Sequence, residues 1–125
     1  MTTVLEERKV EVTPEIKKQI ICLVGSVKQK EDWMRWVAHL TSLGYIVFEA
    51  GLYGTVGDNI SQATWDRVTK VHHKKIGMSH VVGVIRKRNG TVGPHTKDDI
   101  QYAMDHGKMI AKVESIAYHG IFNDW

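Results

Sequence analysis

Four short apolar runs, separated by three segments of helical periodicity, constrain the fold of this chain more than any other feature. The runs are QIICLV (19–24), YIVF (45–48), HVVGVI (80–85) and MIAKV (109–113). Continuous runs rich in β-branched residues are typical of strands buried on both faces of a parallel sheet. The segments between them predict helices over residues 29–43, 60–78 and 96–106. This alternation predicts an α/β fold, a Rossmann-like (flavodoxin-like) three-layer sandwich with a central parallel sheet.

Local signals refine two of the predicted helices. Thr96 is expected to be the N-cap of the third helix. Asp98 and Asp99 then fall in its first turn, where the helix dipole favours acids. The apolar face of the second helix predicts a set of core-facing residues: Trp65, Val68, Val71, His72 and Ile76.

The length of 125 residues fits one domain, residues 19–113. It is preceded by an N-terminal arm or edge strand (1–18) and followed by a C-terminal tail (114–125) without a clear pattern. No run approaches the roughly 18 apolar residues of a membrane span, and the polar N-terminus does not resemble a signal peptide. We therefore expect a cytoplasmic protein with no membrane partner.

Cysteine usage and charge narrow the classes of site. The single cysteine, Cys22, excludes an internal disulfide, and its place in an apolar run predicts an inert core thiol. Between Asp66 and Arg88 there are seven cationic residues against one acid. They form either a basic face that attracts a phosphate-bearing ligand or a solvated helix face followed by a charged loop. Binding of nucleic acid is disfavoured, because no aromatic residues are interleaved with these charges.

Three glycine-containing segments are candidates for ligand binding, because an open parallel sheet binds ligands beyond the carboxyl ends of its strands. They are residues 25–28, 50–59 and 86–96. Two of them lead into helix N-termini, whose free amides attract anions. Neither a P-loop nor a GxGxxG motif is present, which disfavours ATP hydrolysis and dinucleotide-dependent hydride transfer.

Several segments resemble nucleoside 2-deoxyribosyltransferase-like proteins, a family that includes nucleotide N-glycoside hydrolases. The most specific is NGTVGPHTKDDIQYAMDHGKMI (89–110), supported by ICLVGS (21–26), LGYIVF (43–48) and KVHHKKIGMSHVVGVI (70–85). The resemblance covers about residues 19–113. It implies cleavage or transfer of the N-glycosidic bond of a (deoxy)nucleoside or its 5′-monophosphate. It implies no metal or organic cofactor, and it implies a homo-oligomer, a dimer or higher, because family members build their sites across subunit contacts.

The resemblance also implies a catalytic residue. The nucleophile of the family is a glutamate directly before an aliphatic residue, here Ile100, so Asp99 stands at that position. Carboxylates are standard nucleophiles or ion-pair stabilisers at glycosyl centres. Aspartate is one methylene shorter, and a displacement of about 1 Å can cost roughly a hundredfold in rate. From the residues alone, a solvated first-turn acid is the favoured interpretation of Asp99, and the resemblance reverses that preference.

Other departures from the family leave a second function open. Relatives often carry acids where this chain has Gly77 and His80. The alternative is a catalytically inactive protein that sequesters a nucleotide or a nucleotide-derived signal.

The remaining candidates are expected to surround one cavity, with Asp99 at its floor. Tyr102, three residues after Asp99, is a candidate to orient that carboxylate through its hydroxyl, with packing as the alternative. The substrate-binding candidates are Gly25, Ser26, Asp58, Asn59, Gly93, His95 and Thr96. Gly25 and Ser26 are expected at sugar hydroxyls or phosphate, or to form a plain turn.

The resemblance implies that His95 and Thr96 lie at a 5′-phosphate, whereas the residues alone favour Thr96 as a plain helix cap. Asp58 and Asn59 are expected at a base edge, or in an ordinary turn or helix cap. The neighbouring His72 and His73 cannot share one helix face as ligands of a metal ion, so no metal site is predicted.

Overall fold

The computed structural model describes residues 19–51 and 60–125 and contains four strands. In chain order the elements are β1 (Ile20–Val24), α1 (Lys30–Ser42), β2 (Ile46–Phe48), α2 (Gln62–Met78), β3 (Val81–Val84), α3 (Pro94–Asp105), β4 (Met109–Lys112) and a π-helix, η4 (Ser115–His119). All strand pairs are parallel, and the strand order is β2-β1-β3-β4. The predicted α/β, Rossmann-like fold is confirmed, and this order is that of flavodoxin-like sheets.

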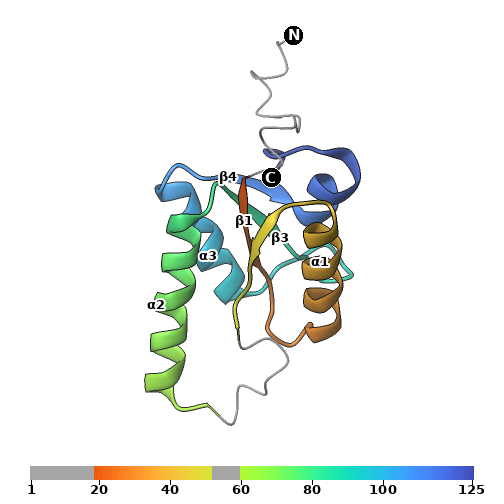
Figure 1. The fold of residues 1–125 in the computed structure, drawn as a ribbon. Coiled ribbons are helices and arrows are strands. Elements are labelled where there is room, and N and C mark those ends of the chain that lie inside the picture. The colour runs from red at the N-terminus through yellow and green to blue at the C-terminus, as the bar shows by residue number, and fades with distance from the viewer. Residues whose placement is uncertain (1–18, 52–59) are drawn as a thin grey trace.

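Helices cover both faces of the sheet, which gives three layers. Figure 1 shows α1 and η4 on one side of the strands and α2 and α3 on the other. Because side chains alternate along a strand, Ile21 and Leu23 pack with Trp33 and Trp36 on the α1 side. The alternate residues pack against α2 and α3, among them the fully buried Cys22. The core position predicted for this cysteine is confirmed.

The predicted core face of α2 is only partly correct. His72 and Ile76 are buried, but Val71 is 49% exposed. Successive residues of a helix are rotated by about 100°, so Val71 cannot share the face that His72 turns to the sheet. The prediction placed too wide a stripe of this helix in the core.

α3 begins earlier than predicted. Gly93 is its N-cap and Pro94 its first residue, so the prediction of Thr96 as N-cap is wrong. Proline suits the first helical position, because its φ is already helical and the missing N–H would have no helical partner. Thr96 is instead buried within the first turn, and Asp98 and Asp99 lie beyond that turn.

The C-terminal residues, which showed no pattern in the sequence, are part of the folded body. Ile116 and Phe122 are buried in the core on the α1 side. The side chains of Asn123 and Asp124 accept hydrogen bonds from the backbone N–H groups of Ile110 and Lys112 in the edge strand β4. These contacts cover an edge that would otherwise carry unpaired amides.

No helix in the described part of the chain is long and apolar enough to cross a membrane. The predicted N-terminal arm, residues 1–18, lies outside the described residues.

Candidate functional site

A cavity of about 420 Å³ lies at the carboxyl edge of the sheet, between the loop after β1, helix α2 and the N-terminus of α3. We call it the α2/α3 cavity. β1 and β3 are neighbours in the sheet, and the connections that leave them cover opposite faces, so this is the topological switch point where open α/β sheets bind ligands. Six of the predicted site residues line it: Gly25, Ser26, Gly93, His95, Thr96 and Asp99.

The loop after β1 is held close to the end of β3. A Cβ atom on Gly25 would lie 2.9 Å from the Cβ of Ile85 and 3.2 Å from its backbone oxygen, so only glycine fits without a shift. The indole N–H of Trp33 donates to the backbone oxygen of Ser26 at 2.8 Å. Tight packing on one side and this hydrogen bond on the other fix the wall that Ser26 contributes to the cavity.

The N-terminus of α3 forms another wall and has the character of an anion site. Its first backbone N–H groups have no helical partner, and two lysines, Lys28 and Lys87, line the same cavity. A Cβ on Gly93 would lie 3.8 Å from the Lys87 Nζ, which places that ammonium group next to the helix start. Free amides and nearby cations together favour a phosphate or carboxylate.

Asp99 is a buried acid with two histidine partners. The residue is 8% exposed. Its Oδ2 lies 3.3 Å from Nδ1 of His72, and its Oδ1 lies 3.1 Å from Nε2 of His73. It is therefore not the solvated first-turn acid of the alternative interpretation.

The hydrogen bonds of His72 identify its protonation state. Its Nε2 lies 3.0 Å from the backbone oxygen of Leu23, which can only accept, so this nitrogen donates. Its Nδ1 faces the Asp99 carboxylate, so both nitrogens carry a proton when Asp99 is ionised. Burial by itself lowers the pKa of the imidazole. The hydrogen bond to Asp99, with smaller contributions from Cys22, outweighs burial and raises the pKa of His72 to about 10. The cavity thus holds a buried carboxylate–imidazolium pair at neutral pH.

Tyr102 contacts His73, the second histidine partner of Asp99, through its ring. Within the described residues the Tyr102 hydroxyl makes no hydrogen bond to Asp99. Its ring stacks on His73, with centroids 4.2 Å apart and planes 11° apart, and on His106 on the other side. Of the two roles considered for Tyr102, the structure therefore supports packing. Tyr102 influences Asp99 only by orienting His73.

Sequence reasoning missed both histidines and the apolar wall of the cavity. Trp65 and Val68 of α2 line it, and the Trp65 ring meets the ring of His95 edge-on at 5.3 Å. The sequence contained one signal for the contact of Asp99 with His72, the position of His72 on the core face of the second helix. A buried polar group requires a partner, so this position indicated a polar contact inside the protein. Because His72 and His73 are neighbours in the chain, they were not expected to share a metal ion. Both rings nevertheless reach the Asp99 carboxylate, since His72 uses Nδ1 and His73 uses Nε2.

Asp58 and Asn59 lie outside the described residues. Across residues 19–51 and 60–125, no group of three or more His, Cys, Asp or Glu side chains is arranged to hold a metal ion.

Comparison with known proteins found no matching family model, no matching curated protein and no matching solved structure. The resemblance to nucleoside 2-deoxyribosyltransferase-like proteins therefore stays a prediction from the sequence.

Proposed function

We propose that the α2/α3 cavity binds a nucleoside 5′-monophosphate and that Asp99 acts on its N-glycosidic bond. One observation carries the proposal: a buried carboxylate and the N-terminus of a helix line the same cavity at the switch point of the sheet. A phosphate at the helix start and a sugar beside Asp99 use both features. The resemblance stated above supplies the reaction class.

The binding mode follows from the chemistry of the walls. The phosphate lies against the first amides of α3 and the ammonium groups of Lys87 and Lys28. The base lies against Trp65 and Val68, because a flat heterocycle gains from contact with an aromatic ring. The sugar is then left between Ser26 and Asp99.

In the reaction, the bond between the anomeric carbon and the base nitrogen breaks, and its electron pair leaves with the base. The Asp99 carboxylate stabilises the positive charge that develops on the sugar, either as an ion pair or by forming a bond to the anomeric carbon. Water or a second base then attacks that carbon and displaces Asp99 where a bond to it has formed. The proton that the attacking group loses passes to the departed base, which completes hydrolysis or transfer. His72 and His73 hold the carboxylate in place during these steps.

The contacts of Asp99 with His72 and His73 also favour a second function. Both oxygens of Asp99 already accept from histidines, and the charge of the His72 imidazolium opposes a cationic sugar. Both effects weaken a nucleophile. A protein that binds the nucleotide and does not cleave it is the alternative that this contact supports.

Chromatography for free base, after incubation with each deoxynucleoside and each 5′-monophosphate, separates the two functions. We expect base release by the wild-type protein and none by Asp99→Asn. Affinity should be largely retained, because the carboxylate acts mainly in the transition state. Asp105→Asn removes an exposed carboxylate from the same helix, outside the cavity, and should retain full activity.

This experiment needs two controls. Near-ultraviolet circular dichroism checks that Asp99→Asn remains folded. The second control is Ser26→Ala, which leaves the ion pair of Asp99 and His72 intact and should raise KM more than it lowers kcat. Binding without base release by wild type supports the nucleotide-binding protein. Undiminished release by Asp99→Asn contradicts a catalytic Asp99.

A further inference from the structure

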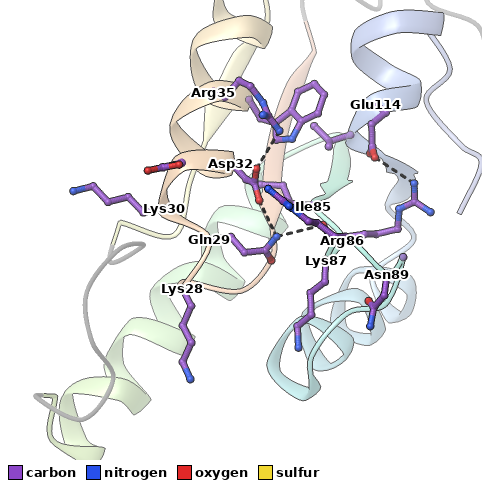
Figure 2. Close-up of a pocket in the computed structure, with 15 residues that line it drawn as sticks. Lys28, Gln29, Lys30, Asp32, Arg35, Ile85, Arg86, Lys87, Asn89 and Glu114 are labelled. Atoms are coloured by element: carbon purple, nitrogen blue, oxygen red, sulfur yellow. Dashed lines mark hydrogen bonds and ion pairs between the residues drawn. The ribbon is translucent and has the colours of Figure 1, made fainter.

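A second and larger cavity, of about 760 Å³, lies at the same edge of the sheet on the side of α1. We call it the α1 groove. Its walls are the first turns of α1, the loop after β3 and the residues that follow β4. Figure 2 shows Lys28 and Lys87 extending in the same direction, from the loops after β1 and β3.

The groove is rich in cations. It is lined by six cationic side chains (Lys28, Lys30, Arg35, Arg86, Lys87 and Arg88) and three acidic ones (Glu31, Asp32 and Glu114). Two of the acids are each paired with an arginine: Asp32 with Arg35 at 3.0 Å and Glu114 with Arg86 at 3.2 Å.

Four cations of the groove make no side-chain hydrogen bond or ion pair to another described residue: Lys28, Lys30, Lys87 and Arg88. The groove therefore presents more positive charge than its own acids neutralise, and its potential attracts anions.

Unpartnered buried polar atoms gather at the same place. Across the described residues, three buried side-chain polar atoms lack a hydrogen-bond partner: Gln29 Oε1, Arg86 Nε and Glu114 Oε1. All three belong to residues that line the groove. Buried polar groups nearly always have partners, so this clustering indicates a polar binding surface rather than a packed one. Gln29 Oε1 and Glu114 Oε1 are acceptors without a donor, whereas the Arg86 Nε–H is a donor without an acceptor, and it is this donor that a phosphate oxygen satisfies.

The two cavities share Lys28 and Lys87 in their linings. A phosphate held at the N-terminus of α3 would lie beside Lys87, and further phosphates linked to it would pass these lysines into the groove. We propose that the α1 groove binds a linear polyphosphate chain, either free or attached to a nucleoside.

The chemistry of the groove favours this ligand over nucleic acid. Trp36 is its one aromatic residue among those described, and its ring is buried under the Arg35 guanidinium at 5.3 Å. Single-stranded nucleic acid requires exposed rings on which bases stack. The groove offers charge without such rings.

Isothermal titration calorimetry of the full chain, at fixed ionic strength, tests the groove with tripolyphosphate. The test variant is Lys30→Ser combined with Arg88→Ser, since these two cations line the groove and not the neighbouring cavity. The control is Lys70→Ser combined with Lys74→Ser, which removes the same charge from exposed positions of α2.

We expect tripolyphosphate to bind wild type more tightly than orthophosphate. The groove variant should bind it roughly tenfold more weakly, from the loss of two close charge contacts. The α2 control should bind it like wild type. Equal affinities of the groove variant and the control for tripolyphosphate would overturn the proposal. The proposal would also fail if wild type bound tripolyphosphate no more tightly than orthophosphate.

Further arms distinguish the ligand sources. A nucleoside triphosphate should bind more tightly than tripolyphosphate, a part of the inference that rests on the proposed function. The protein could bind tripolyphosphate through Lys30 and Arg88 and yet neither bind a nucleoside monophosphate nor release base. That result would support the polyphosphate site and contradict the proposed function. A single-stranded oligonucleotide that binds more tightly than the triphosphate overturns the ligand class.

Discussion

The two cavities at the carboxyl edge of the sheet differ in how they hold charge. In the α2/α3 cavity, Asp99 and His72 are buried and form an ion pair at 3.3 Å. In the α1 groove the comparable pair is partly exposed, with 28% of the Arg86 side chain and 41% of the Glu114 side chain in contact with solvent. A buried pair fixes geometry and cannot lose one member cheaply, whereas a surface pair is screened and adjustable. The first cavity suits a fixed reacting group and the second suits a mobile polyanion.

Removal of one carboxylate from each cavity tests this contrast and should give the largest effect. Asp99→Asn leaves the His72 imidazolium buried without its counter-charge and should lower the free energy of unfolding by about 3 kcal/mol. Glu114→Gln should lower it by less than about 1 kcal/mol, because solvent replaces the lost partner. Urea unfolding at pH 7 measures both. Equal losses would show that the two pairs contribute alike and that burial does not separate them.

The pH dependence of stability sharpens the same contrast. The pKa of His72 is about 10 in the folded protein and about 6.5 in the unfolded chain. The folded state therefore holds this proton more tightly. The stabilisation is present in full below about pH 6.5 and is lost as pH rises through about 10.

Between pH 7 and 10, wild type should lose about 3 kcal/mol of stability from this group. Urea midpoints across that range measure the loss. His72→Gln removes the titrating group and should flatten the profile. Parallel profiles for the two proteins would rule out an imidazolium at this position.

Gly25→Ala perturbs a wall of the α2/α3 cavity and should lower stability by less than Asp99→Asn does. The added methyl group would meet Ile85 at 2.9 Å. Overpacking of this kind costs about 1–3 kcal/mol. Gly77→Ala is the matched control, because its Cβ meets nothing within 4 Å and its helical position favours alanine.

Thermal unfolding of the two glycine variants measures the difference. Gly25→Ala should lower Tm, and it should also weaken ligand binding, since Gly25 lines the α2/α3 cavity. Gly77→Ala should leave Tm unchanged or raise it. A Gly25→Ala protein as stable as wild type would show that the loop after β1 is not held tightly against β3.

Periodicity predicted most of the fold. Continuous apolar runs identified the four strands of the described residues. β1 and β3 are buried between two helical layers, whereas the edge strand β2 is less buried, with Ile46 52% exposed. Boundaries were less certain where two local signals compete, as at the start of α3, where Pro94 prevailed over Thr96 as the marker of the first turn. The C-terminal residues carried too few apolar positions to show a period, although Ile116 and Phe122 are core residues.

The sequence by itself determined that glycine loops meet at one edge of a parallel sheet and that Asp99 lies near them. The tertiary structure alone decided what Asp99 contacts. His72 and His73 lie 27 and 26 positions before it in the chain, and they reach its carboxylate only because α2 and α3 pack side by side on one face of the sheet. Periodicity records which side of a helix is buried, not which buried group of another helix it meets. Hydrogen bonding acts over about 3 Å, so the partners of this acid depend on the packing of whole elements.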